Sequence, residues 1–347
     1  MSLSKLHRQE IINTLLYDIG RSRFYRDFSV GEFADAHKLS KQSVYRYLNI
    51  LEAESKIRKS KGKNNYRLVG SHHQFSYSIN NLKEDVVWNK DIKSLLHDMP
   101  EVALRSCYYA FSEMLNNAID HSEGTEVKIA VNINAYSVSF QITDNGVGIF
   151  AKIASAMQLE EKRFAVLELA KGKFTTDPER HSGEGIFFCS KASDAFGIFS
   201  DGLVFSAINF RNEESERLFD HEAARPGGTT VLFIVFRDHS VTTMELFDRY
   251  TGEPDHYGFT KTIVPVKLLE YGEAQPVFIS RSQAKRLLVR FERFERIELD
   301  FSGIDEIGQG FADEVFRVFR SQHPNSQITA INCNNNVDRM IKHVSRH

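Results

Sequence analysis

The sequence has few cysteines, no long apolar run and almost no net charge, and each of these absences excludes a class of protein. The three cysteines, Cys107, Cys189 and Cys333, are odd in number and far apart, which argues against a disulfide framework or a zinc site. We expect buried thiols instead. No stretch approaches the roughly 18 uncharged apolar residues that span a bilayer, and the first residues have no apolar signal-peptide core. We therefore expect a cytoplasmic protein with no membrane partner.

The charge and the length set the next limits. Lys and Arg number 44 and Asp and Glu 46, a formal net charge of -2, so any basic surface is local. A chain of 347 residues is too long for one ordinary core, so two or three domains are expected. The sequence shows no internal repeat. We predict domains at 1–70, 100–240 and 263–347, with linkers at 71–99 and 241–262.

Residues 1–70 have the pattern of two helices joined by a tight turn, followed by a basic hairpin. The turn falls at Leu39 and Ser40, Ser40 is a plausible N-cap, and Val44, Leu48 and Leu51 form the apolar face of the second helix. The stretch KIRKSKGKNNYRL then predicts two strands with a polar tip. This segment resembles a winged helix-turn-helix. A small helical dimerisation or adaptor domain with a solvated basic hairpin fits the same pattern.

A winged helix-turn-helix makes DNA an expected partner, although such a domain does not by itself prove DNA binding. The polar face of the second helix and the hairpin carry residue types suited to base edges and phosphates. The DNA-binding candidates are Gln42, Ser43, Arg46, Arg58, Lys59, Lys61 and Lys63.

The stretch EMLNNAIDHS, residues 113–122, is an apolar helical stripe that carries unusually many polar groups. Glu113 and Asn117 are four residues apart, so they share a helix face and project together from it. Two alternating strands follow and end in DNGVG at 144–148. Further on come SGEG at 182–185 and GGTT at 227–230. Each of these motifs is a weak signal alone. Their order, a helix, two strands and three glycine-rich loops, is a more specific signal of a binding site.

In this order the four motifs resemble the nucleotide-binding boxes of the GHKL ATPase superfamily, which includes histidine kinases, gyrase B, Hsp90, MutL and the anti-sigma factor serine kinases. The resemblance covers about residues 100–237, and FTTDPERHSGEG is particularly similar to the anti-sigma factor kinases. It implies a Bergerat-type α/β sandwich that binds ATP with Mg²⁺. The whole chain is then a multidomain α+β protein, with a helical winged-helix domain before the sandwich and a small STAS-like α/β domain after it.

The resemblance also implies roles for the polar residues. The Asn117 amide oxygen is expected to ligate magnesium together with triphosphate oxygens and water. Glu113 is expected to orient or deprotonate an attacking water or hydroxyl, as the catalytic residue. Asp144 is expected to accept a hydrogen bond from the exocyclic amine of adenine. Asp120 would support the adenine pocket or its water network, and His121 would either approach phosphate or cap the helix end.

The glycine-rich loops supply the remaining nucleotide-binding candidates. Glycines permit a close backbone approach to the ligand, which a Cβ would obstruct, and backbone N–H groups ahead of a helix receive phosphate. One of two adjacent threonines is expected near the adenine, and the sequence does not say which. These candidates are Gly146, Gly148, Gly183, Gly185, Thr229 and Thr230.

Between the boxes, residues 150–182 form a basic, polar, glycine-bounded stretch. It fits a lid that orders over the triphosphate, and a merely solvated loop fits as well. It contains Lys162, Arg163, Lys171, Lys173 and Arg180.

Residues 263–347 alternate strand, helix, strand, helix, strand, with Ser280 or Ser282 as a helix cap. The stretch LDFSGIDEIGQGFADEVF resembles a STAS-like domain, the type of protein on which anti-sigma factor kinases phosphorylate a serine. Here Gln309 stands just before Gly310, where that serine would fall, so self-phosphorylation at this position is excluded. Ser302 is interpreted as a turn residue. We expect this domain to bind a protein partner, and a homodimer is a further expectation.

Two functions follow from the sequence. In the first, the protein is an ATP-binding regulator, in which nucleotide binding with slow hydrolysis controls DNA or partner binding by the flanking domains. In the alternative, it is a serine/threonine protein kinase, similar to the anti-sigma factor kinases, that acts on a separate protein. A sensor histidine kinase is disfavoured because no long dimerising helix with a phosphoacceptor histidine precedes the ATP-binding segment.

Overall fold

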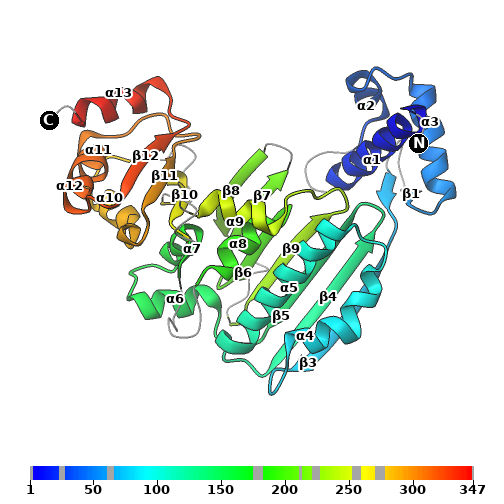
Figure 1. The fold of residues 1–347 in the computed structure, drawn as a ribbon, viewed down its shortest axis with the longest axis horizontal. Coiled ribbons are helices and arrows are strands. Elements are labelled where there is room, and N and C mark those ends of the chain that lie inside the picture. Colours follow the sequence, from blue (N-terminus) through cyan, green and yellow to red (C-terminus); the bar gives the residue numbers. More distant parts are fainter. Residues whose placement is uncertain are drawn as a thin grey trace.

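The computed structural model describes residues 3–22, 28–60, 66–174, 183–210, 213–220, 227–251, 259–269 and 278–345. In these ranges the chain forms an N-terminal helical unit, a central antiparallel sheet covered by helices, and a C-terminal α/β unit (Figure 1). The two terminal units lie on opposite sides of the central sheet (Figure 1). Across these ranges no helix has the length and apolar character needed to cross a membrane.

The N-terminal unit contains three helices and a hairpin: α1 Leu3–Ser22, α2 Val30–Ala36, α3 Lys41–Ala53, β1 Ile57–Lys59 and β2 Tyr66–Leu68. The predicted cap is confirmed, because the Ser40 side chain accepts the Ser43 N–H at 3.1 Å. Val44, Leu48 and Leu51 are fully buried in the core of this unit. The two strands of the hairpin are antiparallel.

The central sheet has seven strands in the order β3-β4-β5-β9-β6-β7-β8, and every neighbouring pair is antiparallel. Burial alternates along β4 and β5, so one face of these strands packs inward. Helix α5 Glu101–His121 crosses that face, and the Phe111 ring lies 5.8 Å from the Phe140 ring. The strands are β3 Gly70–Ser78, β4 Glu126–Asn134, β5 Ser137–Asp144, β6 Ala195–Ser200, β7 Leu203–Phe210, β8 Glu213–Asp220 and β9 Thr230–Phe236.

The prediction of a linker at 71–99 was wrong. This segment forms β3, which pairs with β4 along its whole length, followed by α4 Glu84–Val87 and the short turns Trp88–Ile92 and Lys93–Leu96. Trp88 is buried, with its ring 5.3 Å from the Phe111 ring of α5. The strand was missed because most of its residues are polar and only Phe75 and Tyr77 pack against the core.

The predicted linker at 241–262 is likewise partly folded. Helix α9 Thr243–Tyr250 begins with a capping box, in which the side chains of Thr242 and Glu245 bond each other's backbone N–H. Leu246 and Tyr250 are buried. Residues 252–258 lie outside the described residues.

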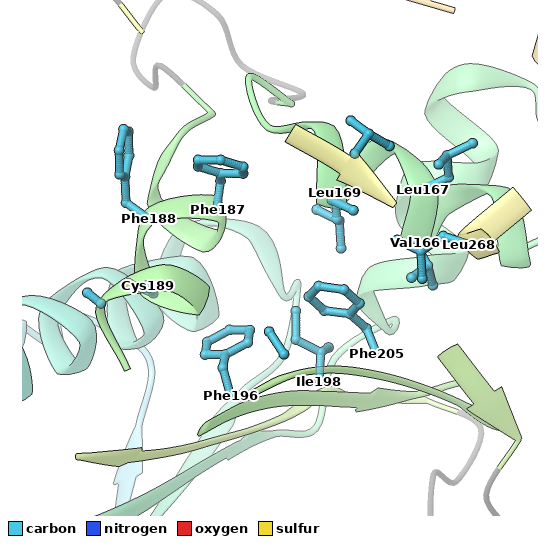
Figure 2. Close-up of a cluster of buried hydrophobic side chains, with 14 of the residues drawn as sticks. Val166, Leu167, Leu169, Phe187, Phe188, Cys189, Phe196, Ile198, Phe205 and Leu268 are labelled. Carbon is cyan, nitrogen blue, oxygen red and sulfur yellow. The ribbon is translucent and has the colours of Figure 1, made fainter. Parts of the chain in front are cut away.

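Helices α6 Ile149–Met157, α7 Arg163–Lys171 and α8 Gly185–Ala192 complete the cover of the sheet. Figure 2 shows Phe187 of α8 and Leu169 of α7 in one hydrophobic cluster with Phe205 of β7 and Leu268. Leu268 belongs to the turn Val266–Leu269 of the C-terminal unit, so the two units share one core. Cys107 and Cys189 are buried and Cys333 is partly buried, and all three are free thiols.

The C-terminal unit is a three-stranded parallel sheet in the order β10-β11-β12, crossed by helices. The predicted alternation is confirmed, with a last helix, α13, that was not predicted. Ser280 is the cap of α10, and Ser302 donates its hydroxyl to Asp300 within a turn, as interpreted. The elements are β10 Lys261–Pro265, α10 Arg281–Leu288, a turn Phe291–Arg293, β11 Arg296–Asp300, α11 Gln309–Asp313, a π-helical turn Glu314–Val318, α12 Phe319–Gln322, β12 Gln327–Ile331 and α13 Asn335–Val344.

A buried histidine just after β9 makes the stability depend on pH. The Nδ1 of His239 lies 3.1 Å from Asp194 Oδ2, and its Nε2 lies 3.0 Å from the Val241 carbonyl. Burial by itself lowers the pKa of His239, but these acceptors and the Asp194 charge outweigh it and raise the pKa. The resulting stabilisation is fully present below the unfolded pKa of about 6.5 and is lost as the pH rises through the higher folded pKa.

We therefore expect His239→Gln to lower the melting temperature more at about pH 6 than at about pH 9. Thermal unfolding followed by circular dichroism at both pH values measures the difference. His97→Gln is the control, because this histidine is exposed and its partner among the described residues is the nearby Ser94 carbonyl. Equal losses at the two pH values for His239→Gln would contradict the assignment.

Candidate functional site

A cavity of about 330 Å³ lies between α5, α6 and α8 and the adjoining ends of β5 and β9. Its apolar walls include Ile142, Ile153, Leu169 and Val231. Such a volume, apolar with a few convergent polar groups, is typical of a small-molecule site. The polar side chains that line it are Glu113, Asn117, His121, Ser122, Asp144, Lys152 and Thr229.

Two polar residues of α5, Glu113 and Asn117, reach the cavity from one helix face, as their spacing predicts. The Asn117 Nδ2 atom is buried and has no hydrogen-bond partner among the described residues. A buried amide with an unmet donor is uncommon in a native fold and points to a missing polar ligand. Glu113 lies against the start of α8, where a Cβ on Gly185 would come within 2.2 Å of Glu113 Oε2. Gly185 is therefore needed for this close approach.

Asp144 follows β5 and is held in place by backbone donors. Its Oδ1 accepts the Gly146 N–H at 2.9 Å and the Thr229 N–H at 3.1 Å. Within the described ranges no hydrogen bond reaches its Oδ2, so this oxygen is left as an acceptor for a ligand. Burial raises the pKa of Asp144, against the lowering effect of the backbone donors. A fixed, partly desolvated carboxylate suits the recognition of an N–H donor.

The structure separates the remaining candidates into those at the cavity and those away from it. His121, Gly148, Gly183, Gly185 and Thr229 line the cavity.

Three of the predicted nucleotide-binding residues do not line the cavity. Asp120 is exposed, because it lies on the outer side of α5. A Cβ on Gly146 would lie 2.0 Å from the Ser122 carbonyl, so this glycine lets the 144–148 loop pack on the end of α5. Thr230 pairs its hydroxyl with Thr143 on the sheet at 3.0 Å. The structure thus distinguishes the two threonines, because Thr229 is the one at the cavity, where it accepts the Ile149 N–H.

Lys152 is a cavity residue that the sequence analysis missed. Its ammonium donates to the His121 carbonyl at 2.7 Å and to Glu123 Oε1 at 2.8 Å, so it links α6 to the end of α5. The only sequence signal was its position one helical turn after Gly148.

Four of the five cations named at 150–182 have partners away from the cavity in the part of the chain that the structure describes, so the lid over the triphosphate stays a prediction. Lys162 pairs with Asp201 at 3.2 Å, Arg163 pairs with Glu161, and Lys171 pairs with Glu168. Lys173 donates to the Arg293 carbonyl. None of these four lines the cavity. Arg180 lies outside the described residues.

The described DNA-binding candidates lie on α3 and β1 of the N-terminal unit, and Figure 1 shows this unit well apart from α6 and α8, which border the cavity. Gln42, Ser43 and Arg46 lie together along a shallow depression on α3. Arg58 and Lys59 are exposed on β1, and Arg58 lies directly opposite Arg67 of β2. Lys61 and Lys63 lie outside the described residues.

Comparison with known families agrees with this geometry. Residues 104–239 match the model of the histidine kinase-, DNA gyrase B-, and HSP90-like ATPase family, and residues 283–338 match a STAS-like domain of unknown function. No curated protein matches the chain. The chain thus contains an ATP-binding GHKL domain and a C-terminal STAS-like domain, joined to a helical N-terminal unit.

Proposed function

We propose that ATP in this cavity controls what the flanking domains bind, DNA at the N-terminal end and a protein partner at the STAS-like end. The observation that carries the proposal is that both units pack directly on the ATPase domain. Tyr17 of α1 contacts the rings of Tyr136 and Phe236 at 5.5 and 5.9 Å. The STAS-like domain shares the hydrophobic core of the ATPase sheet. A change in the ATPase domain on nucleotide binding therefore reaches surfaces at both ends of the molecule.

The cavity residues support specific roles toward ATP. Asp144 Oδ2 accepts the adenine amine, Thr229 lies beside it just before β9, and Gly148 lines the same cavity at the start of α6. The oxygen of Asn117 fits magnesium, which takes most of its ligands from phosphates and water and so needs few from protein. When bound, the metal neutralises charge on the phosphates. The Asn117 Nδ2, unpartnered among the described residues, is then a donor toward a phosphate oxygen or ordered water.

Glu113 is placed to act on a water molecule. Its position against the N-terminus of α8 brings the carboxylate close to Gly185, which the family pattern assigns to the phosphate end of the site. The same position suits a kinase, in which the carboxylate takes a proton from a hydroxyl on a separate protein. The STAS-like loop has Gln309 where such a hydroxyl would fall, so this position of the chain is not a phosphate acceptor and we propose a separate substrate protein.

The exposed arginines of the hairpin support an anionic partner. Like charges directly opposite on neighbouring strands destabilise a hairpin, and Arg58 and Arg67 occupy such a pair. A DNA phosphate between them would offset this repulsion. With α3 presenting Gln42, Ser43 and Arg46, the unit is proposed to bind DNA as a winged helix-turn-helix, with α3 in the major groove.

The test is DNA binding by the full chain without nucleotide, with ADP and with ATP, each with Mg²⁺, over a salt series. Fluorescence anisotropy of a labelled mixed-sequence duplex reports the affinity. We expect ATP to change DNA affinity at least about fivefold. Arg58→Ala with Lys59→Ala should weaken binding and reduce the salt slope by about 2. Lys90→Ala with Lys128→Ala, exposed on the ATPase domain, is the matched control. DNA affinity that is the same in all nucleotide states would overturn ATP control.

Incubation with γ-labelled ATP and cell extract separates the regulator from the kinase. Release of free phosphate alone, slowed about 100-fold by Glu113→Gln, is the expected result for a regulator. Transfer of label to another protein, lost in the same variant, would instead establish the kinase.

A further inference from the structure

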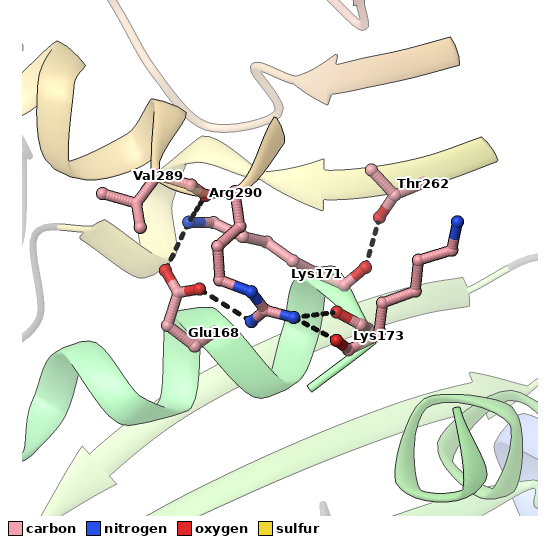
Figure 3. A network of polar contacts seen from close by, with 7 residues as sticks. Glu168, Lys171, Lys173, Thr262, Val289 and Arg290 are labelled. Carbon is pink, nitrogen blue, oxygen red and sulfur yellow. Dashed lines mark hydrogen bonds and ion pairs between the residues drawn. The ribbon is translucent and has the colours of Figure 1, made fainter. Parts of the chain in front are cut away.

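One side chain of the STAS-like domain, Arg290, lies beside the nucleotide cavity. Its guanidinium donates to Glu168 Oε2 at 3.0 Å and to the carbonyls of Gly172 and Lys173 (Figure 3). Glu168 belongs to α7 of the ATPase domain, and Gly172 and Lys173 follow directly after that helix. Arg290 therefore holds the turn that follows α7, and the Glu168 side chain of that helix, from the neighbouring domain.

Further contacts from the same side hold this helix end. The Lys171 ammonium is fully buried and donates to Glu168 and to the Val289 carbonyl at 2.9 Å. Thr262 of β10 donates its hydroxyl to the Lys171 carbonyl at 2.8 Å. Apart from the Lys171–Glu168 bond, which lies within α7, these contacts join the STAS-like domain to the end of that helix (Figure 3). The junction is thus a connected polar network rather than a loose contact.

The network reaches the cavity through Phe174. The Arg290 guanidinium lies 5.2 Å from the centre of the Phe174 ring, within cation–π range. Phe174 lines the cavity, and its N–H donates to the carbonyl of Gly183, which lines it too. Leu169 of α7 is a third lining residue on this side. Phe174 therefore contacts both Arg290 of the STAS-like domain and the cavity.

Arg290 is one of nine described non-glycine residues with a positive φ. Its φ is +64°, in the left-handed region that residues with a Cβ seldom adopt. Such a conformation costs free energy and persists where surrounding contacts hold it, often at functional sites. Arginine is the residue type that suits this position, because a planar guanidinium can bond a carboxylate and two carbonyls while its face contacts an aromatic ring.

We propose that Arg290 is a positioning residue for the ATP site, so that the STAS-like domain completes this site in cis and its docking is coupled to nucleotide binding. The proposal rests on the ATP binding argued above. Arg290 holds the end of α7 and Phe174 in place before the nucleotide binds, so binding costs less conformational entropy. Coupling between two binding events is reciprocal, so ATP strengthens the docking of the STAS-like domain by the same factor. A partner that pulls this domain away would release the nucleotide.

The first test is the affinity of the full chain for a fluorescent ATP analogue with Mg²⁺. We expect Arg290→Lys to weaken the affinity for the analogue roughly 5- to 50-fold. An ammonium keeps the positive charge near Glu168, but it cannot bond the carboxylate and two carbonyls at once or lie flat against the Phe174 ring as a guanidinium does. Arg320→Lys, exposed on α12, is the matched control and should bind as wild type does. Affinity of the Arg290 variant within about twofold of wild type would overturn the proposal.

The second test needs no variant and so does not depend on the folding of one. Hydrogen exchange of α10 amides, residues 281–288, is compared in the wild-type chain with and without ATP. Coupling predicts slower exchange with ATP, and in Arg290→Lys that effect should largely disappear. Unchanged exchange in a wild type that binds ATP would overturn the coupling alone. Absence of ATP binding by the wild type would instead overturn the proposed function, and this proposal with it.

Discussion

Replacing Asp144 by Asn should lower the affinity for ATP at least about 100-fold and leave the nucleotide-free protein as stable as wild type. The carboxylate offers Oδ2 to the adenine amine, whereas the amide of Asn would present a donor or a weaker acceptor to it. The Asn oxygen still accepts the N–H groups of Gly146 and Thr229, so the loop keeps its shape. Binding of a fluorescent ATP analogue and thermal unfolding measure the two effects.

The expected stability follows from the direction of the pKa shift. The folded state raises the pKa of Asp144, so the ionised carboxylate is disfavoured by folding above the unfolded pKa of about 3.9. A neutral Asn removes this cost near pH 7, and the melting temperature should not fall. Asp120→Asn, on the exposed side of α5, is the control and should bind ATP normally. An ATP affinity of Asp144→Asn equal to that of wild type would show that Asp144 does not recognise the adenine amine.

Replacing Glu168 by Ala should lower the free energy of unfolding by about 3–5 kcal/mol. Lys171 is fully buried and Arg290 nearly so, and both bond the Glu168 carboxylate. Burial lowers the pKa of Lys171, and the negative charge of Glu168 opposes this effect. Without Glu168 two cations remain close together inside the protein, because each loses its only carboxylate partner among the described residues.

Urea unfolding of wild type, Glu168→Ala and Glu161→Ala provides the measurement. Glu161 pairs with Arg163 at the surface, so its loss should cost less than about 1 kcal/mol. Equal losses in the two variants would mean that the buried network does not contribute to stability. Glu168→Gln should lie between the two, since an amide oxygen still accepts a bond from one of the cations.

The periodic parts of this fold were predictable from local sequence. The helix with Glu113 and Asn117, the hairpin β4–β5 and the alternation of the C-terminal unit depend on apolar spacing and turn residues, which act over a few positions. The cap at Ser40 is of the same kind. Edge strand β3 was missed because only one of its faces meets the core, and that face carries little apolar sequence.

Site residues were predictable where a local motif fixes their positions, and less predictable where contacts between distant segments fix them. The spacing that joins Glu113 and Asn117 is a property of the helix itself. The roles of Lys152 and Arg290 depend on segments that are distant in sequence, so no local pattern shows them. The lysines at 162, 171 and 173 looked like ligands for phosphate because three of their acceptors are distant in sequence: Asp201, the Val289 carbonyl and the Arg293 carbonyl.

The position of β9 in the sheet determines when the sheet can be completed during synthesis of the chain. Strand β9 is the last strand of the sheet in the chain, yet it lies between β5 and β6. A nascent chain on the ribosome therefore carries two separate antiparallel pieces with unpaired edges until residue 236 has emerged. Thr229 and Val231 enter the cavity with this strand, and Arg290 is translated later still. The nucleotide cavity is thus incomplete until β9 has been made, and a chain that terminates before this strand has no complete site.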